Sequence, residues 1–435
     1  MSSHANARTI CIVAPGYISS MPRVVKEADA LAAAGYRVRV VSSQGDVEHV
    51  RPNDQLVADQ RRWRWDVVGW SRHRSGERRT YWRSTARQRA FAAAPAWAWQ
   101  LGNVAERADG QLYPELARRA SSEHADLYIG HYPAGLAAAA AAARRHDALF
   151  AYDVEDLHTG EHDDTAWGRG RAARIDFIES RYANDCAHIT ASSPGIASAF
   201  ARRRAMNAPT VVHNVFPWQD RLTVDREVRD RRGDTLSLYW CSQSVGVERG
   251  LVDAMVAIGL LGGPVQLHVR GTISSDTLAT LSSIAAANGV AEHVTFHPQV
   301  SPGELLSRTM EHDVGLALEQ GHTANNCIAA SNKLFLYMLA GLAVAATDVP
   351  GQRAIADVTP DAVRLYPPGE PARLAEMLER WRRDPDALAA DRAAALDAAR
   401  SRWNWEREQA VLIDAVDATL RVRRTASYSA SGAQP

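Results

Sequence analysis

Two segments in the second half of the chain combine a cationic side chain with the start of a predicted helix. Arg249-Gly250 lies where a loop turns into a helix over 251–258, and Ser331-Asn332-Lys333 opens a helix over 334–340. A hydrogen bond to a charged group contributes about 1.5–3 kcal/mol, whereas a helix terminus at a surface contributes only ~0.3–1 kcal/mol. Because a cation is unfavourable in a first helical turn unless an anion is nearby, we predict that Arg249 and Lys333 hold a pyrophosphate. The alternative for Lys333 is a solvated side chain.

Other polar residues follow predicted strands, where each strand ends. In open α/β sheets, ligands bind beyond the carboxyl ends of the strands, so we expect these residues to surround one ligand. Any one of these residues could simply cap a helix or form a turn, so the prediction of a ligand site rests on the whole set. The set comprises Gly16, His131, Asp153, Glu155, Asp156, His158 and Asn214 in the first half, and Ser242, Gln243, Arg270 and Glu319 in the second half.

Short apolar segments rich in β-branched residues predict the strands that position these groups. Helical periodicity separates most of them, as over 21–34, 302–312 and 331–340. This alternation predicts an α/β fold with two doubly wound, Rossmann-like parallel sheets facing each other across a cleft. The predicted strands are 9–14, 36–41, 126–130, 148–152, 188–191, 210–213, 236–241, 265–269, 294–296, 314–318, 342–346 and 362–365.

The order of these segments predicts the domain organisation. We expect a first Rossmann-like domain over 1–220, a polar linker over 221–235 and a second Rossmann-like domain over 236–400. A helix over 401–424 follows, and a disordered Ser/Ala/Gly-rich tail over 425–435 ends the chain.

The composition of the 435 residues narrows the function classes. Fifty basic and fifty acidic residues give a net charge of zero, which argues against a nucleic-acid partner. Four scattered cysteines show no CxxC spacing and fit a reducing compartment. No apolar run approaches the ~20 residues that cross a bilayer, and the first eight residues lack the apolar stretch of a signal peptide. We therefore expect a cytoplasmic protein, with peripheral attachment to the inner face of the membrane left open.

The segment 61–89 differs from the rest of the chain. It carries ten arginines against two acidic residues, together with Trp63, Trp65, Trp70 and Trp82. A basic, aromatic insertion of this kind could lie on an anionic membrane surface or grip an acidic substrate. The alternative is a loop whose arginines cover exposed indole rings.

A zinc hydrolase is a weaker alternative. Residues 158–162 match the HxxEH pattern of inverted zincins, which needs a helix with both histidines on one face. Gly160 interrupts the pattern and the position after a strand favours a loop, so no metal site is predicted.

Several stretches resemble bacterial glycosyltransferases of family 4, which have the two-domain GT-B fold. The resemblance spans roughly residues 9–420 and is strongest in the sequences VGLALE and SNKLFLYMLAGL at 314–319 and 331–342. Supporting stretches lie at 131–133, 152–156, 191–193, 213–215 and 403–406. In this fold the last helix crosses back to the first domain.

The resemblance implies transfer of a sugar from a nucleotide-activated donor, commonly with retention of configuration and without a cofactor or metal. The donor would be a UDP- or GDP-linked sugar bound by the second domain. The acceptor would be a glycan, a lipid-linked or a small molecule, bound mainly by the first. The resemblance assigns Gly16, Arg249 and Lys333 to the diphosphate and places His131 near the transferred sugar, where we expect it to act in catalysis with Glu319. From their positions at strand ends and at a helix start, we expect two further groups: Gln243, Arg270, Ser331 and Asn332 at the nucleotide or sugar, and Asp153, Glu155, Asp156 and His158 on the acceptor or sugar side.

The sequence departs from the family pattern in three places. The usual paired glutamates align with Ile328 and Leu336, the diphosphate-binding arginine falls near Gln243, and Ala343 replaces a proline. The second glutamate normally holds the nucleotide ribose, and Glu319 is a candidate substitute. The alternative function is therefore a non-catalytic GT-B protein that binds a sugar nucleotide or a partner protein.

Overall fold

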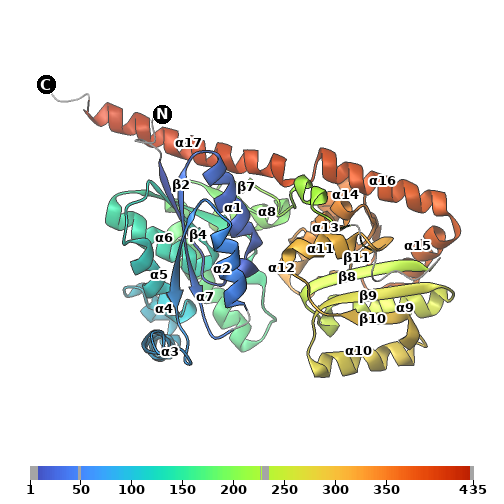
Figure 1. Cartoon of the computed structure of the whole chain (residues 1–435). Helices are drawn as coiled ribbons and strands as arrows, with labels where there is room; N and C mark the ends of the chain where they lie inside the picture. Colours follow the sequence, from blue (N-terminus) through green and yellow to red (C-terminus); the bar gives the residue numbers. More distant parts are fainter. Residues whose placement is uncertain (1–7, 48–49, 226, 228–234, 432–435) are drawn as a thin grey trace. The chain divides into compact units, whose positions relative to one another are not determined.

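The computed structural model describes residues 8–47, 50–225, 227 and 235–431 (Figure 1). The chain divides into two compact units. The first unit contains the chain up to Ser192, Ile196–Val212 and the residues from Gln409 onward. The second unit contains Ser193–Gly195 and His213–Glu408.

The first unit is built on a seven-stranded parallel sheet with strand order β3-β2-β1-β4-β5-β6-β7. Buried aliphatic side chains such as Ile10, Ile12 and Ile129 form its core with Val24 and Leu31 of α1. The strands are β1 (Thr9–Val13), β2 (Arg37–Gln44), β3 (Arg64–Gly69), β4 (Leu127–His131), β5 (Leu149–Val154), β6 (Ile189–Ala191) and β7 (Thr210–Val211).

Small residues let helices approach this sheet closely. The alanine-rich helix α6 is buried along most of its length, and a Cβ atom on Gly135 would lie 2.5 Å from the carbonyl oxygen of Val13. The helices of this part of the chain are α1 (Pro22–Ala33), α2 (Arg51–Asp59), α3 (Arg78–Ala92), α4 (Val104–Asp109), α5 (Tyr113–Ala120), α6 (Tyr132–His146), α7 (Ala166–Tyr182) and α8 (Pro194–Arg204).

The second unit has a six-stranded parallel sheet with strand order β10-β9-β8-β11-β12-β13. Its core includes Trp240 and Trp381, each about 1% exposed. The strands are β8 (Leu236–Ser244), β9 (Val265–Thr272), β10 (Val294–His297), β11 (Val314–Ala317), β12 (Ala343–Thr347) and β13 (Arg364–Tyr366). The helices are α9 (Leu251–Leu261), α10 (Ser275–Ala287), α11 (Pro302–Thr309), α12 (Ala324–Ile328), α13 (Asn332–Ala340), α14 (Pro350–Val358), α15 (Pro371–Arg383) and α16 (Pro385–Ser401).

The last helix, α17 (Trp405–Ser431), returns the chain to the first unit, as the sequence predicted. Its Val416 and Leu420 are buried in the core that contains Ile10, and the Thr419 hydroxyl lies 2.8 Å from Nδ1 of His188. The helix continues through most of the tail that was predicted to be disordered over 425–435. Residues 432–435 of that tail, like 226 and 228–234 of the predicted linker, lie outside the described residues.

The expectation that 61–89 is an insertion was wrong, because part of it belongs to the sheet itself. Strand β3 pairs in parallel with β2 at the sheet edge, and α3 follows it. The Arg39 guanidinium forms a buried ion pair with Asp66, with Nε 2.5 Å from Oδ2. Arg64 and Trp65 are therefore residues of β3, a strand that the apolar pattern of the sequence did not predict. No helix among the described residues combines the length and apolarity that a membrane span requires.

Candidate functional site

In the second unit, Lys333 and Glu319 form the centre of the predicted diphosphate site. Glu319 follows β11, and Lys333 lies in the first turn of α13. The Lys333 ammonium lies 2.5 Å from Oε1 of Glu319 and 5.5 Å from the ring centroid of Trp240. The Ser331 hydroxyl donates to the same Oε1 at 3.0 Å. Both side chains of the ion pair keep partial access to solvent, at 14% and 20% exposure, so a ligand can reach them.

The electrostatics of this group keep Glu319 ionised. Burial favours the neutral carboxyl, but the charge of Lys333, the hydrogen bonds from Lys333 and Ser331, and the charge of Arg249 together lower the pKa of Glu319 below its usual value. This group therefore pairs an anionic carboxylate with the Lys333 ammonium, and the charge of Arg249 acts on the same carboxylate.

Arg249 lies in the loop that precedes α9, and the residue that follows it is a glycine. Gly250 has a φ of 78°, and a Cβ atom there would lie 2.3 Å from the carbonyl oxygen of Leu318. Only glycine lets the loop lie against the end of β11 in this way. The Arg249 guanidinium itself is loosely held, since Nη1 is 3.5 Å from the Ser242 hydroxyl and Nε is 3.7 Å from Glu248.

The other residues predicted in this unit differ in their accessibility. Gln243 and Asn332 are exposed, at the end of β8 and the start of α13. Arg270, at the end of β9, is only 5% exposed, and its Nη1 donates to the carbonyl of Pro298 at 3.1 Å. Leu336, which aligns with a family glutamate, is 3% exposed and packs in the core as part of α13.

In the first unit, His131 lies at the end of β4 within a buried network of charges. Its Nε2 is 2.6 Å from Glu27 of α1, and its Nδ1 is 3.3 Å from Oδ2 of Asp153. Asp153 is also bound by both Nε and Nη2 of Arg23, at 2.5 and 2.8 Å, and accepts a hydrogen bond from Thr190 at 2.8 Å. His131 has no exposed surface.

Burial and the surrounding carboxylates act in opposite directions on His131. Burial disfavours the imidazolium, but Glu27 and Asp153 outweigh burial and raise the pKa of His131. Burial likewise disfavours the Asp153 carboxylate, but Arg23 outweighs it and lowers the pKa of Asp153. Ligand atoms of Glu27, His131 and Asp153 lie within 4.8 Å of one another, a spacing that could hold a cation. Here the Arg23 guanidinium binds both oxygens of Asp153 and supplies the positive charge instead, so the network does not fit a metal.

Tyr132 is a candidate residue that the sequence did not single out. It follows His131 directly and has a φ of 60°, which is strained for a residue with a large side chain. Its ring centroid lies 5.3 Å from that of His158. Strained backbone at the end of a strand accompanies functional sites often enough to direct attention to this turn.

The remaining residues predicted in the first unit are partly or fully buried. Glu155 and Asp156 are half-buried, and burial raises the pKa of Glu155. Burial lowers the pKa of His158, but the hydrogen bond from its Nδ1 to Glu161, at 2.8 Å, outweighs this and raises that pKa to about 9. Gly16 is half-buried, and its carbonyl accepts from the backbone N–H of Ser43 at 3.1 Å.

The HxxEH segment does not form the helix that a zincin needs. His158–Gly160 is a single 3-10 turn, and Glu161 is the partner of His158 rather than a free base. This geometry does not support the hydrolase alternative.

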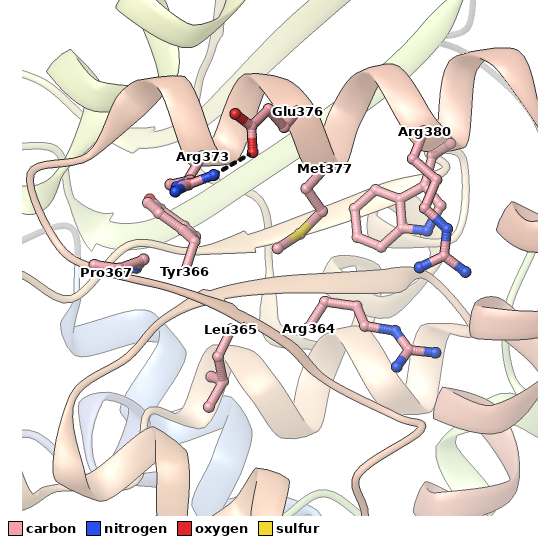
Figure 2. A pocket seen from close by; sticks show the side chains of 9 residues that line it. Arg364, Leu365, Tyr366, Pro367, Arg373, Glu376, Met377 and Arg380 are labelled. Carbon is pink, nitrogen blue, oxygen red and sulfur yellow. Dashed lines mark hydrogen bonds and ion pairs between the residues drawn. The ribbon is translucent and has the colours of Figure 1, made fainter.

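A separate cavity of about 370 Å³ lies between β13 and α15 (Figure 2). Arg364, Tyr366, Met377 and Trp381 are among the residues that line it. None of the predicted site residues lines this cavity, so it is distinct from the Lys333 group.

The fold is similar to that of solved glycosyltransferases, although no family model and no curated protein sequence matches the chain. HepE of Anabaena, crystallised with UDP and glucose, is 13% identical with a TM-score of 0.66 over 94% of this chain and 100% of its own. A glycosyltransferase of Rickettsia africae is 11% identical with a TM-score of 0.65, over 95% and 99% of the two chains. Sucrose-phosphate synthase of Thermosynechococcus elongatus is 13% identical with a TM-score of 0.63, over 97% and 100%. These matches confirm the GT-B fold.

Proposed function

We propose that this GT-B protein is a glycosyltransferase that takes a sugar from a nucleotide-linked donor, with the donor diphosphate bound in the second unit. The observation that carries the proposal is the ion pair of Lys333 with Glu319 beyond the end of β11, at a carboxylate whose pKa the charge of Arg249 also lowers. Crystals of HepE contain UDP with glucose, and UDP-glucose. These complexes support a UDP-linked sugar as the first donor to test, with GDP-linked sugars next.

The two cations fit the chemistry of a leaving diphosphate. As the bond from the sugar to the diphosphate breaks, negative charge develops on the leaving oxygen, and fixed cations stabilise it. The Lys333 ammonium has three N–H donors, so it can keep its bond to Glu319 while it donates to a phosphate oxygen. The Trp240 ring beneath the ammonium restricts its position.

Glu319 is proposed to replace the missing family glutamate. Its Oε1 accepts both the Lys333 and the Ser331 hydrogen bonds, while Oε2 accepts none from the described residues. In this proposal Oε2 accepts a hydroxyl of the donor ribose or sugar, and Oε1 holds Lys333 in place. Ser331, Asn332, Gln243 and Arg270 are proposed to contact the nucleotide or sugar, with Arg270 limited by its burial.

The roles in the first unit rest on the resemblance. His131 is proposed to act beside the transferred sugar, a role limited, as for Arg270, by its complete burial. Gly16 is proposed to lie near the diphosphate, and Glu155, Asp156 and His158 on the acceptor or sugar side. The Arg23 contacts of Asp153 favour a positioning role for this residue, because both of its oxygens are already bound. Retention of configuration, a glycan, lipid-linked or small-molecule acceptor, a cytoplasmic location and contact with an anionic membrane surface belong to the same proposal.

The proposal is tested by donor turnover. The purified full chain is incubated with a panel of UDP- and GDP-linked sugars, and release of the free nucleotide is measured. One donor should be hydrolysed slowly or transferred, and Lys333→Ala should lower its turnover or affinity about tenfold or more, the loss of one charged hydrogen bond. Arg383→Ala, which removes a cation 74% exposed on α15, is the matched control and should leave turnover unchanged.

Two outcomes would overturn the proposal. If no donor is turned over but one binds, as shown by a thermal shift, the non-catalytic alternative replaces the enzyme. If Lys333→Ala behaves as the parent protein does, the diphosphate site is placed wrongly.

A further inference from the structure

A second basic pocket lies in the first unit, between α3 and α5. It has a volume of about 220 Å³ and is lined by four arginines, one glutamate and one threonine. These residues are Arg79, Thr80, Arg83, Arg87, Glu115 and Arg118. None of them belongs to the residues assigned to the donor or the acceptor above.

The arginines of this pocket are arranged along one face of α3. Arg79, Arg83 and Arg87 follow one another at intervals of four residues, which places their side chains on the same face of a helix. Like charges at this spacing destabilise a helix by about 0.2–0.5 kcal/mol for each pair. The arrangement is therefore unfavourable unless negative charge is bound opposite it.

The protein supplies only part of that negative charge. Glu115 binds Arg87 through both oxygens, at 2.9 and 2.5 Å. Arg79, Arg83 and Arg118 make no side-chain hydrogen bond or ion pair with any of the described residues. The Nε–H group of Arg87 is buried and has no acceptor among the described residues. Three exposed guanidinium groups, which only water solvates in the free protein, and one buried N–H without an acceptor therefore line one pocket.

The start of α3 adds to the positive potential. Its first turn contains no acidic residue, and Arg78 and Arg79 occupy it instead, where the helix dipole disfavours cations. Glu77, which precedes the helix, makes no capping bond and is held by Arg51 at 2.6 and 2.9 Å. This part of the helix therefore retains both its cations and its positive dipole.

We infer that the pocket between α3 and α5 binds a phosphate group. Guanidinium groups bind phosphate oxygens through paired N–H donors, and three unpaired arginines around a small pocket match a phosphate better than a carboxylate or a neutral polar group. The phosphate can come from a lipid headgroup or from a soluble phosphate ester. Trp82, 59% exposed on the same helix, would lie beside the bilayer in the first case.

Binding to the full chain tests this inference in two arms. The first measures affinity for glycerol 3-phosphate by calorimetry. The second measures sedimentation with vesicles of phosphatidylglycerol and phosphatidylcholine against vesicles of phosphatidylcholine alone. Arg79→Gln/Arg83→Gln should weaken the binding seen in the parent protein at least tenfold. The control Arg145→Gln/Arg202→Gln removes two exposed cations of the first unit, on α6 and α8, outside the pocket and should have no effect.

Each outcome has a defined meaning. If the pocket variant loses vesicle binding, and glycerol 3-phosphate competes with the vesicles for the parent protein, the ligand is a lipid headgroup. If the variant loses only the binding of glycerol 3-phosphate measured by calorimetry, the ligand is a soluble phosphate ester. Absence of binding in both arms, or equal binding by the pocket variant and the parent, overturns the inference. Lys333→Ala should retain this binding, so the result is independent of the proposed donor site.

Discussion

The charge network around His131 gives a quantitative prediction about stability. Asp153→Asn removes a carboxylate that is 3% exposed and leaves the Arg23 guanidinium, 4% exposed, without its anionic partner. Removing one partner of a buried ion pair typically costs 3–5 kcal/mol, because the remaining charge is buried and uncompensated. For a unit of this size, each kcal/mol lowers the melting temperature by about 2–4 °C, so we expect a decrease of roughly 6–20 °C.

The measurement must separate the two units, because a chain with two units need not unfold in one step. Calorimetry should show the loss in one transition, and hydrogen exchange should assign it to the amides of β4 and β5. Glu123→Gln is the control, since its ion pair with Arg64 is about half exposed and such pairs contribute about 0.2–1 kcal/mol. A decrease no larger than that of Glu123→Gln would refute the account of the network.

The same network predicts a pH dependence with a defined sign. The pKa of Asp153 is lowered in the folded chain, so its contribution to stability is present above the unfolded value of about 3.9 and is lost as the pH falls through the folded value. The pKa of His131 is raised, so its contribution is complete below about 6.5 and is lost as the pH rises through the folded value.

Three further predictions concern single residues. Glu319→Gln should raise the donor KM about tenfold, because the group that holds Lys333 and is proposed to accept a donor hydroxyl loses its charge. An unchanged KM would show that Glu319 is not part of the donor site. Gly250→Ala should reduce donor binding with little change in α-helix content, because its Cβ would overlap the carbonyl oxygen of Leu318, and an unchanged affinity would show that the loop can move without loss. The pKa of His158 is raised to about 9, so its contribution to stability is complete below about pH 6.5 and is lost as the pH rises past 9. His158→Gln should therefore remove this loss of stability in alkali. A variant that loses as much stability as the parent protein between about pH 6.5 and 9 would contradict this.

The regular apolar pattern made most of the fold predictable. Strands such as β1, β4 and β11 are apolar runs bounded by glycine, proline or charged residues, and each was placed within a few residues. Strand β3 was missed because its residues RWDVVG interrupt the apolar pattern with an arginine and an aspartate, and Asp66 is satisfied by Arg39 from the neighbouring strand. That compensation depends on strand pairing, which local pattern does not contain.

The candidate site was predictable to a similar extent. The first-turn position of Lys333 identified it as a cation in need of an anion, and the structure supplies Glu319 as one such anion. Glu27 and Arg23 were not identified, although both are charged residues within a predicted helix whose other positions are largely apolar. Their partners, His131 and Asp153, come from strands more than a hundred residues away, so no local spacing could pair them.

A crystal structure of the full chain with UDP tests the central claim most directly. We expect a diphosphate oxygen within about 3 Å of the Lys333 ammonium and within reach of the Arg249 guanidinium. A nucleotide bound elsewhere, for example in the cavity between β13 and α15, with Lys333 bound only to Glu319, would contradict it.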